Sequence, residues 1–376
     1  MKIPARKSSS IAVNLLACVA VTAFAQQPAA SPASPSSAGS ASKVTEIVVP
    51  VTVRDKKGQP VSNLKADDFT LNDNADPQTI KSFTRETALP NRYGLLVDTS
   101  RNQEAALADE RSATGKFVDA MLLQPADKAF LLHFDHEVEL LQDFTAAKPK
   151  LHHELDEMSS SSYSGGQGSQ SGGDSEEGGG RRHGGKQMYD AIYLASNELM
   201  LKDPGRKVLI VLSDGVDRGS KESLNDSIDA AEKANVEVYT VYFKGEEEHN
   251  SSGGPGMGRR GGTGGGGYPG GGGGYPGGGR GGQRPGGASE VKVDGKKILE
   301  QIASRTGGIY FEAKKKDSFD EIYTQIGDQI HGQYFLTYTP DKASIKDESD
   351  RFHKILLKAK DEKYAVTTPE GYYSTN

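Results

Sequence analysis

The chain has 376 residues, a formal net charge of −6, 35% hydrophobic residues and 46 glycines. This length is enough for two domains, but the low hydrophobic content means that much of the chain lies outside any core. The negative charge disfavours nonspecific binding to nucleic acid, so we expect no nucleic-acid partner.

Residues 1–25 have the composition of a signal peptide. Basic residues come first, an apolar stretch runs from Ile11 to Phe24, and Ala23-Phe24-Ala25 has the small residues of a cleavage site. The apolar stretch is shorter than the roughly 20 residues of a spanning helix, and no later segment is long and apolar enough to replace it. We therefore expect an exported protein, periplasmic or secreted. Its formal net charge falls from −6 to −9 on cleavage, because the leader carries three basic residues and no acidic ones.

The only cysteine, Cys18, lies in this leader, so the mature chain can form no disulfide. Leu15-Leu16-Ala17-Cys18 loosely resembles a lipoprotein box. Anchoring through a lipidated Cys18 is the less favoured alternative, because the apolar run before it would be very short.

The mature chain begins with a linker and a β segment. Residues 26–43 are rich in Ala, Ser and Pro and are expected to be disordered. Residues 44–88 predict three short strands, of which Val44 to Arg54 is the clearest, and Pro50 marks it as an edge strand or a bulge.

Three strands cannot close a core alone, and residues 333–376 predict further alternating strands. We expect both segments to form one small β-sandwich with an α/β domain inserted between its halves. The alternative is that each half is a separate flap on the α/β domain.

Residues 91–331 alternate apolar strands with amphipathic helices. This alternation predicts a doubly wound, mostly parallel sheet. The predicted strands are Tyr93 to Asp98, Lys128 to Asp135, Glu137 to Leu141, Val208 to Leu212, Val236 to Phe243 and Ile309 to Phe311. Two low-complexity insertions, residues 159–185 and 251–288, are expected to be disordered and to leave the domain at the ligand-bearing edge of the sheet.

Small oxygen-bearing side chains follow two of these strands. Asp98 and Ser100 come at the end of the first, and Ser213-Asp214-Gly215 follows the fourth. Ligand sites of open α/β sheets lie at the carboxyl ends of the strands, so the two acids are expected to meet there.

This pattern resembles the von Willebrand factor A domain and its metal-ion-dependent adhesion site. That family carries D-x-S-x-S after its first strand, a Thr on a separate loop and an Asp after its fourth strand. Asp98, Ser100 and Asp214 match, whereas Asn102 replaces the second Ser and Lys186 stands where the family has Thr. The order of several weaker motifs resembles a bacterial exported family related to this domain: Val51 to Gly58, Thr306-Gly307-Gly308, Gln333-Tyr334 and Gly371-Tyr372-Tyr373.

The resemblance implies a metal site formed by Asp98, Ser100, Asn102 and Asp214, holding Mg²⁺ or another divalent cation. Lys186 opposes this, because it offers only donors and a positive charge. An ammonium about 4 Å from a divalent ion is repelled by roughly 8 kcal/mol at an effective dielectric near 20, although a flexible Lys could swing into water. Two interpretations stay open: a weakly held ion, or a Lys186 ammonium that replaces the ion and neutralises both acids.

The resemblance implies a noncatalytic protein that binds a protein or cell-surface ligand, in the family through an acidic side chain that completes the metal shell. A purely structural alternative is that Asp98 and Asp214 cap the helices that follow them. Two further alternatives are a metal-dependent hydrolase or phosphatase that uses Asp98, and a scaffold that acts through its Gly-rich insertions. Against the phosphatase, Ser100 stands where an aspartyl-phosphate enzyme needs a second acid, and no phosphate loop follows the first strand.

Overall fold

A computed structural model describes residues 46–85, 89–159, 186–244, 294–314, 318–340 and 352–374. The predicted leader and linker, and the two predicted insertions except Ser159, lie outside these residues. Among the helices that are described, none is long and apolar enough to cross a membrane.

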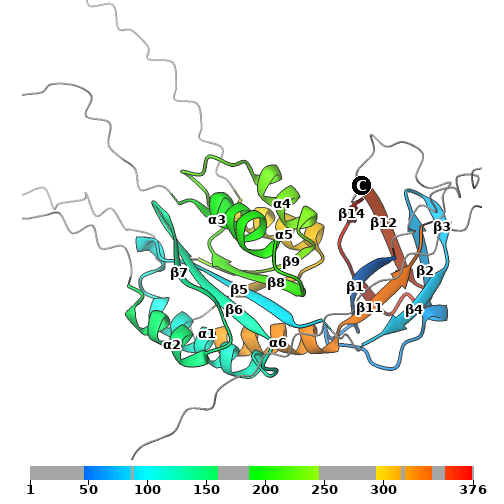
Figure 1. Cartoon of the computed structure of the whole chain (residues 1–376), viewed down its shortest axis with the longest axis horizontal. Helices are drawn as coiled ribbons and strands as arrows, with labels where there is room; N and C mark the ends of the chain where they lie inside the picture. Colours follow the sequence, from blue (N-terminus) through cyan, green and yellow to red (C-terminus); the bar gives the residue numbers. More distant parts are fainter. Residues whose placement is uncertain are drawn as a thin grey trace, which may run out of the picture. The chain divides into compact units, whose positions relative to one another are not determined.

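The α/β domain is built on a six-stranded sheet (Figure 1) with the order β10-β9-β8-β5-β6-β7. Five strands are parallel, and the edge strand β7 is antiparallel to β6. The strands are β5 (Asn91–Asp98), β6 (Lys128–Phe134), β7 (Val138–Thr145), β8 (Arg206–Ser213), β9 (Val236–Phe243) and β10 (Tyr310–Ala313). The central strands are buried on both faces, as their continuous apolar sequences predict.

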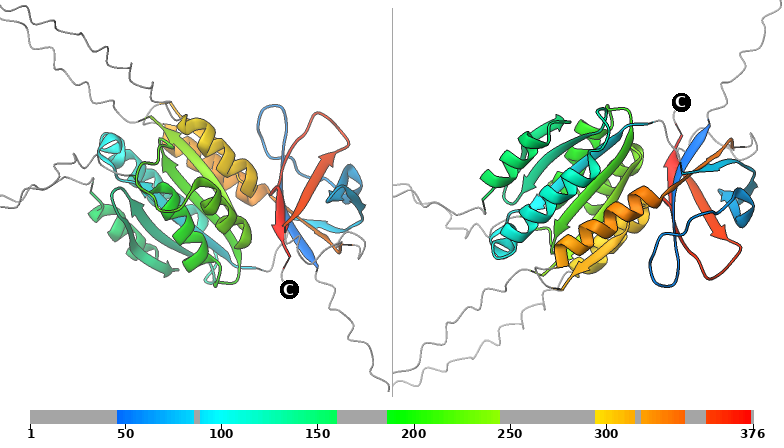
Figure 2. Two further views of the ribbon diagram at one scale, coloured as in Figure 1. Left: turned by 90° about the horizontal axis from the view of Figure 1, so that it is seen from above. Right: turned by 90° about the horizontal axis from the view of Figure 1, so that it is seen from below.

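Helices cover both faces of this sheet. One layer contains α1 (Leu107–Met121), α2 (Lys148–Glu157) and α6 (Ser318–Gly332), and the other contains α3 (Met188–Leu194), α4 (Leu224–Lys233) and α5 (Gly295–Thr306). Seen from below, α1 and α6 lie side by side beneath the sheet (Figure 2). The helix that begins with α3 continues as a π-helix over Ala195–Met200, and a short 3-10 helix, Arg101–Gln103, precedes α1.

The remaining strands form two four-stranded antiparallel sheets that pack on a shared apolar core. Their orders are β13-β1-β11-β4 and β14-β12-β2-β3. The strands are β1 (Ile47–Arg54), β2 (Phe69–Asp73), β3 (Asp76–Gln78), β4 (Ile80–Thr84), β11 (Tyr334–Tyr338), β12 (Phe352–Ala359), β13 (Ala365–Thr367) and β14 (Gly371–Tyr373), with a 3-10 turn at Ala66–Asp68. Each sheet combines strands from before and after the α/β domain. The predicted fold class, a mostly parallel α/β sheet with a β-sandwich from the two terminal segments, is confirmed.

An acidic side chain lies in the core of the sandwich. Asp73 is fully buried at the end of β2, and its Oδ2 accepts hydrogen bonds from the hydroxyls of Tyr338 (2.9 Å) and Tyr372 (3.0 Å). His353 Nδ1 lies 3.2 Å from Asp73 Oδ1, and its ring stacks on Tyr372. Because these partners come from β11, β12 and β14, one carboxylate links both halves of the sandwich.

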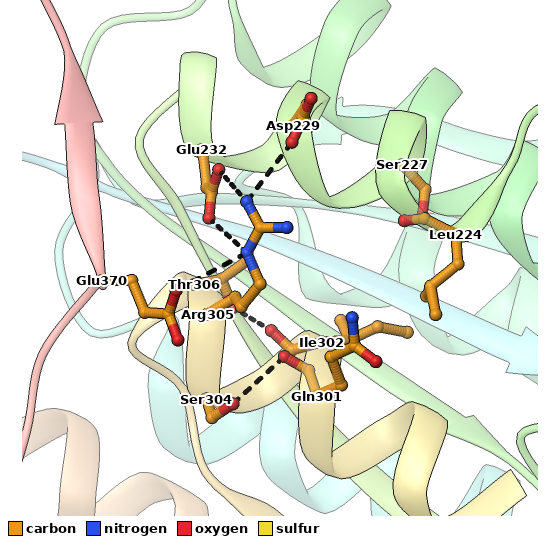
Figure 3. A network of polar contacts seen from close by, with 10 residues as sticks. All are labelled: Leu224, Ser227, Asp229, Glu232, Gln301, Ile302, Ser304, Arg305, Thr306 and Glu370. Atoms are coloured by element: carbon orange, nitrogen blue, oxygen red, sulfur yellow. Dashed lines mark hydrogen bonds and ion pairs between the residues drawn. The ribbon is translucent and has the colours of Figure 1, made fainter. Parts of the chain in front are cut away.

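Polar contacts also join the sandwich to the α/β domain. Arg305 of α5 forms a bidentate ion pair with Glu232 of α4, at 3.0 and 2.8 Å, and its side chain lies 3.9 Å from Glu370 before β14 (Figure 3). Gln333, the single residue between α6 and β11, donates to Glu237 of β9 (2.5 Å) and to Thr52 of β1 (3.2 Å). The two parts of the molecule therefore share buried and half-buried hydrogen bonds.

We predict that Asp73→Ala destabilises the protein by about 3 kcal/mol, because it leaves two buried tyrosine hydroxyls and one imidazole without their acceptor. Urea unfolding followed by circular dichroism measures this loss. Asp67→Ala, at an exposed position of the same segment, is the control and should change stability little. Equal effects of the two substitutions would contradict the role assigned to Asp73.

Candidate functional site

The two acids predicted to meet do lie at one edge of the sheet. Asp98 is the last residue of β5, and Asp214 directly follows β8. These strands are adjacent and parallel, with Val97 opposite Leu212, so both loops leave the sheet at the same level. The side chain of Asp98 is 0% exposed and that of Asp214 is 16% exposed.

The Asp98 carboxylate is held by groups from both strand ends. Its Oδ2 accepts a hydrogen bond from Ser213 Oγ (2.7 Å), and its Oδ1 accepts one from the backbone N–H of Ser100 (3.0 Å). The Ser100 side chain is buried in the same loop, and its Oγ makes no hydrogen bond of standard geometry to any residue that the structure describes. Burial raises the pKa of Asp98, and the positive charge of Lys186 opposes that rise.

Lys186 joins the two acids. Its Nζ lies 3.1 Å from Asp98 Oδ2 and 2.8 Å from Asp214 Oδ2, and its side chain is 8% exposed. Burial disfavours the charged ammonium, but the two carboxylates outweigh burial and raise the pKa of Lys186. The three side chains therefore form a buried ammonium–dicarboxylate centre with a formal charge of −1.

The peptide group that joins Lys186 to Gln187 is hydrogen bonded at both its carbonyl and its N–H. Its carbonyl accepts a hydrogen bond from the N–H of Arg218 (3.1 Å), in the loop between β8 and α4. The N–H of the next residue, Gln187, donates to the carbonyl of Asp135 (3.0 Å), which follows β6. Lys186 is thus positioned by two neighbouring loops and not by its side chain alone.

Two further acids, which the sequence analysis missed, hold these loops together. The Asp190 carboxylate accepts the backbone N–H groups of Lys221 (3.0 Å) and Glu222 (2.8 Å), and Asp217 Oδ2 accepts that of Tyr189 (3.0 Å). Asp190 lies in the first turn of α3, but its carboxylate binds N–H groups of another loop, so no local pattern in the sequence could have indicated this contact.

Asn102 lies apart from this centre. It is exposed in the 3-10 helix Arg101–Gln103, and no contact described for Asp98, Asp214 or Lys186 involves it. The structure thus brings Asp98, Asp214 and Lys186 into contact, places Ser100 beside them and leaves Asn102 at the rim.

As placed, these residues do not fit a divalent ion. Both carboxylates direct an oxygen at the Lys186 ammonium, where the ion's anionic ligands would be needed. Within the part of the chain that the structure describes, no group of three or more His, Cys, Asp or Glu side chains could hold a metal. The buried hydroxyl of Ser100 would suit a hard ion, but it does not offset the positive charge beside it.

A buried acid lies beneath the centre. Glu110 of α1 is 0% exposed, and neither of its carboxylate oxygens has a hydrogen-bond partner among the described residues. Burial, and secondarily the negative charge of Asp98, raises the pKa of Glu110 well above its usual value. Gln103 is also buried and donates to the carbonyl of Phe243 (3.3 Å), but its own oxygen is unpartnered. The face of α1 toward the core is therefore partly polar.

Comparison with solved structures finds several proteins of low sequence identity. A von Willebrand factor type A protein from Catenulispora acidiphila is 11% identical, with a TM-score of 0.41 over 82% of this chain and 75% of that chain. An aerotolerance-related membrane protein from Bacteroides fragilis is 13% identical, with a TM-score of 0.39 over 64% of this chain and 98% of that chain. Proximal thread matrix protein 1 from the mussel byssus, with a zinc-occupied MIDAS motif, is 11% identical, with a TM-score of 0.40 over 65% of this chain.

This chain spans about half of the mussel protein, 48% of its length. No protein-family model matches the chain, and no curated protein matches its sequence. The strand order, the antiparallel edge strand and the acids at the ends of the first and fourth strands of the sheet agree with the resemblance noted in the sequence. The α/β domain has a von Willebrand factor A-like fold. In this A-like domain, a lysine ammonium lies between the two acids of the motif.

We predict that Glu110→Gln makes the A-like domain less sensitive to pH. The unfolded chain loses the Glu110 proton near the ordinary pKa of 4.5, whereas the folded chain keeps it to higher pH. The folded state then binds more protons, so stability falls with rising pH, by at most about 1.4 kcal/mol per pH unit for one group. The substituted glutamine does not titrate and removes this part of the decline.

The unfolding free energies of wild type and variant are measured at about pH 5 and about pH 8. The effect is the difference between the two proteins in the slope of unfolding free energy against pH. Glu104→Gln, at an exposed position just before α1, is the matched control and should keep the wild-type slope. An unchanged slope in Glu110→Gln would show that Glu110 is ionised in the folded protein.

Proposed function

We propose that this is an exported, noncatalytic protein that binds a protein or cell-surface ligand through the carboxyl edge of its A-like sheet. The observation that supports this is the ammonium–dicarboxylate centre itself, in which Lys186 joins Asp98 to Asp214 at 3.1 and 2.8 Å. It is a fixed, charged arrangement at the edge where open α/β sheets bind ligands. The signal-peptide composition of residues 1–25 supports export.

The geometry favours binding over catalysis. A hydrolase or phosphatase that uses Asp98 needs that carboxylate to reach a substrate or a metal. Here Asp98 is 0% exposed and is already bound by Lys186, Ser213 and the Ser100 backbone. The scaffold alternative depends on the two Gly-rich insertions, which lie almost wholly outside the described residues.

The loops around the centre supply the contact surface. Asn102 and Arg218 are exposed at its rim, and the Arg218 backbone also holds Lys186. We propose that an acidic side chain of the partner, which in the family completes a metal shell, would here pair with an exposed cation such as Arg218. The partner contact would then be an ion pair at the surface and sensitive to salt.

We predict that a photo-crosslinking amino acid at position 102 captures the partner and that one at position 123 does not. Asn102 lies near the start of α1 at the carboxyl edge, whereas Leu123 is 62% exposed just beyond the end of α1, at the opposite edge of the sheet. The mature protein carrying either label is irradiated with the envelope fraction of the producing cells, and adducts are identified by mass spectrometry.

A specific adduct from position 102 that an excess of unlabelled protein suppresses is the expected result. The same adducts from both positions, or adducts from position 123 alone, would contradict binding through the carboxyl edge.

A further inference from the structure

The cation of the centre is part of the chain. Nζ of Lys186 contacts the Oδ2 atom of each of the two acids, Asp98 and Asp214. A formal count for the centre is two negative charges and one positive charge, whereas a divalent ion in the same place would make it neutral. The centre therefore differs from a metal site in charge as well as in composition.

All four carboxylate oxygens of Asp98 and Asp214 already have donors in the protein. Asp98 Oδ1 accepts from the Ser100 N–H, and Oδ2 accepts from Ser213 Oγ and from Lys186. Asp214 Oδ1 accepts from the Val216 N–H (3.0 Å), and Oδ2 accepts from Lys186. Each of the four carboxylate oxygens therefore already contacts a donor of the protein. An ion would have to displace the ammonium to bind there.

Displacement of Lys186 is opposed by its surroundings. Its side chain is 8% exposed, and backbone hydrogen bonds through Arg218 and Asp135 fix the segment from which it projects. Moving the ammonium into water would leave the fully buried Asp98 without a counter-charge, which is strongly unfavourable. The geometry thus disfavours the swing into solvent that a flexible lysine otherwise allows.

We propose that the Lys186 ammonium is the permanent cation of this adhesion-type centre, so that the centre neither binds nor requires a divalent ion. This inference rests on the proposed function, because it specifies which cation lies at the edge of the sheet that is proposed to bind the partner. Partner binding is then insensitive to chelators. The partner does not insert a carboxylate into a metal shell, and it meets a preformed surface whose charge does not depend on the supply of metal.

Isothermal titration of Mg²⁺, Mn²⁺ and Ca²⁺ into the mature protein tests the inference. Wild-type protein should show no saturable binding in the millimolar range. Lys186→Thr, which supplies an oxygen in place of the ammonium, should bind at least one of these ions at least tenfold more tightly than wild type. The matched control is Lys207→Thr, which removes another partly buried lysine, at the opposite end of β8 from Asp214. This variant should show no saturable metal binding.

A second measurement, of thermal unfolding, tests the inference on the wild type even if the Lys186→Thr variant misfolds. A bound ion raises the thermal midpoint as its concentration increases. The wild-type midpoint should therefore be the same with Mg²⁺ and with EDTA, whereas that of Lys186→Thr should rise with Mg²⁺. Saturable binding by the wild type that Asp98→Ala abolishes, or a wild-type midpoint that falls in EDTA and is restored by Mg²⁺, would overturn the inference.

Repeating the crosslinking from position 102 in EDTA separates the two proposals. Adducts that persist in EDTA support both. Adducts that disappear in EDTA and return with Mg²⁺ would overturn the proposal that Lys186 is the permanent cation. The proposal of binding through the carboxyl edge would still hold. If position 102 gives no adducts and the wild type binds no metal, the proposal of binding through the carboxyl edge is overturned. The proposal that Lys186 is the permanent cation then still holds.

Discussion

The arrangement of the A-like domain depends on the charge balance at the end of β5. Asp98 is an acid with no exposed surface, and a buried carboxylate is tolerated only with a counter-charge and hydrogen bonds. Lys186 supplies the charge, and Ser213 and the Ser100 backbone supply the hydrogen bonds. Three chain segments that are distant in sequence are thereby joined at one point.

The same interaction orders the loops at the carboxyl edge. Lys186 reaches both acids only because its backbone is tied to the loops after β6 and β8, and Asp190 and Asp217 tie the start of α3 to the second of these loops. At the other side of the domain, Gln333 and Arg305 link it to the sandwich. Several backbone hydrogen bonds therefore hold the described loops of the face proposed to bind, and a preorganised face loses little conformational entropy on binding.

Much of this could be predicted from local patterns. The apolar runs before Asp98 and Asp214 indicated adjacent buried strands, and parallel strands place their following residues at one edge. The position of Lys186 was suggested by resemblance, but its direction was left open between the two acids and water. Whether a lysine turns toward acids or into water depends on the contacts of Gln187 and Arg218 with other loops, and these involve backbone atoms that carry no side-chain signal.

Two other residues show why the remainder could not be predicted. Asn102 replaces a ligand Ser of the motif, and the short 3-10 helix turns Gln103 inward, where it bonds to the Phe243 carbonyl, and leaves Asn102 outside. Glu110 shares the helical face of Leu107 and Thr114, but an acid is normally assigned to the surface. Its burial becomes apparent only when α6 covers that face of α1, with Tyr323 bonded to Thr114.

The pairing of early and late strands in the sandwich has a consequence for the order of folding. β1 pairs with β11 and β13, and β2 pairs with β12 on one side and with its neighbour β3 on the other. During synthesis from the N-terminus, β1 and one edge of β2 therefore remain unpaired until the whole A-like domain has emerged. Their apolar side chains and free backbone groups are a hazard for aggregation throughout that interval. We infer that the A-like domain folds first and that the sandwich closes last, as the step that completes the molecule.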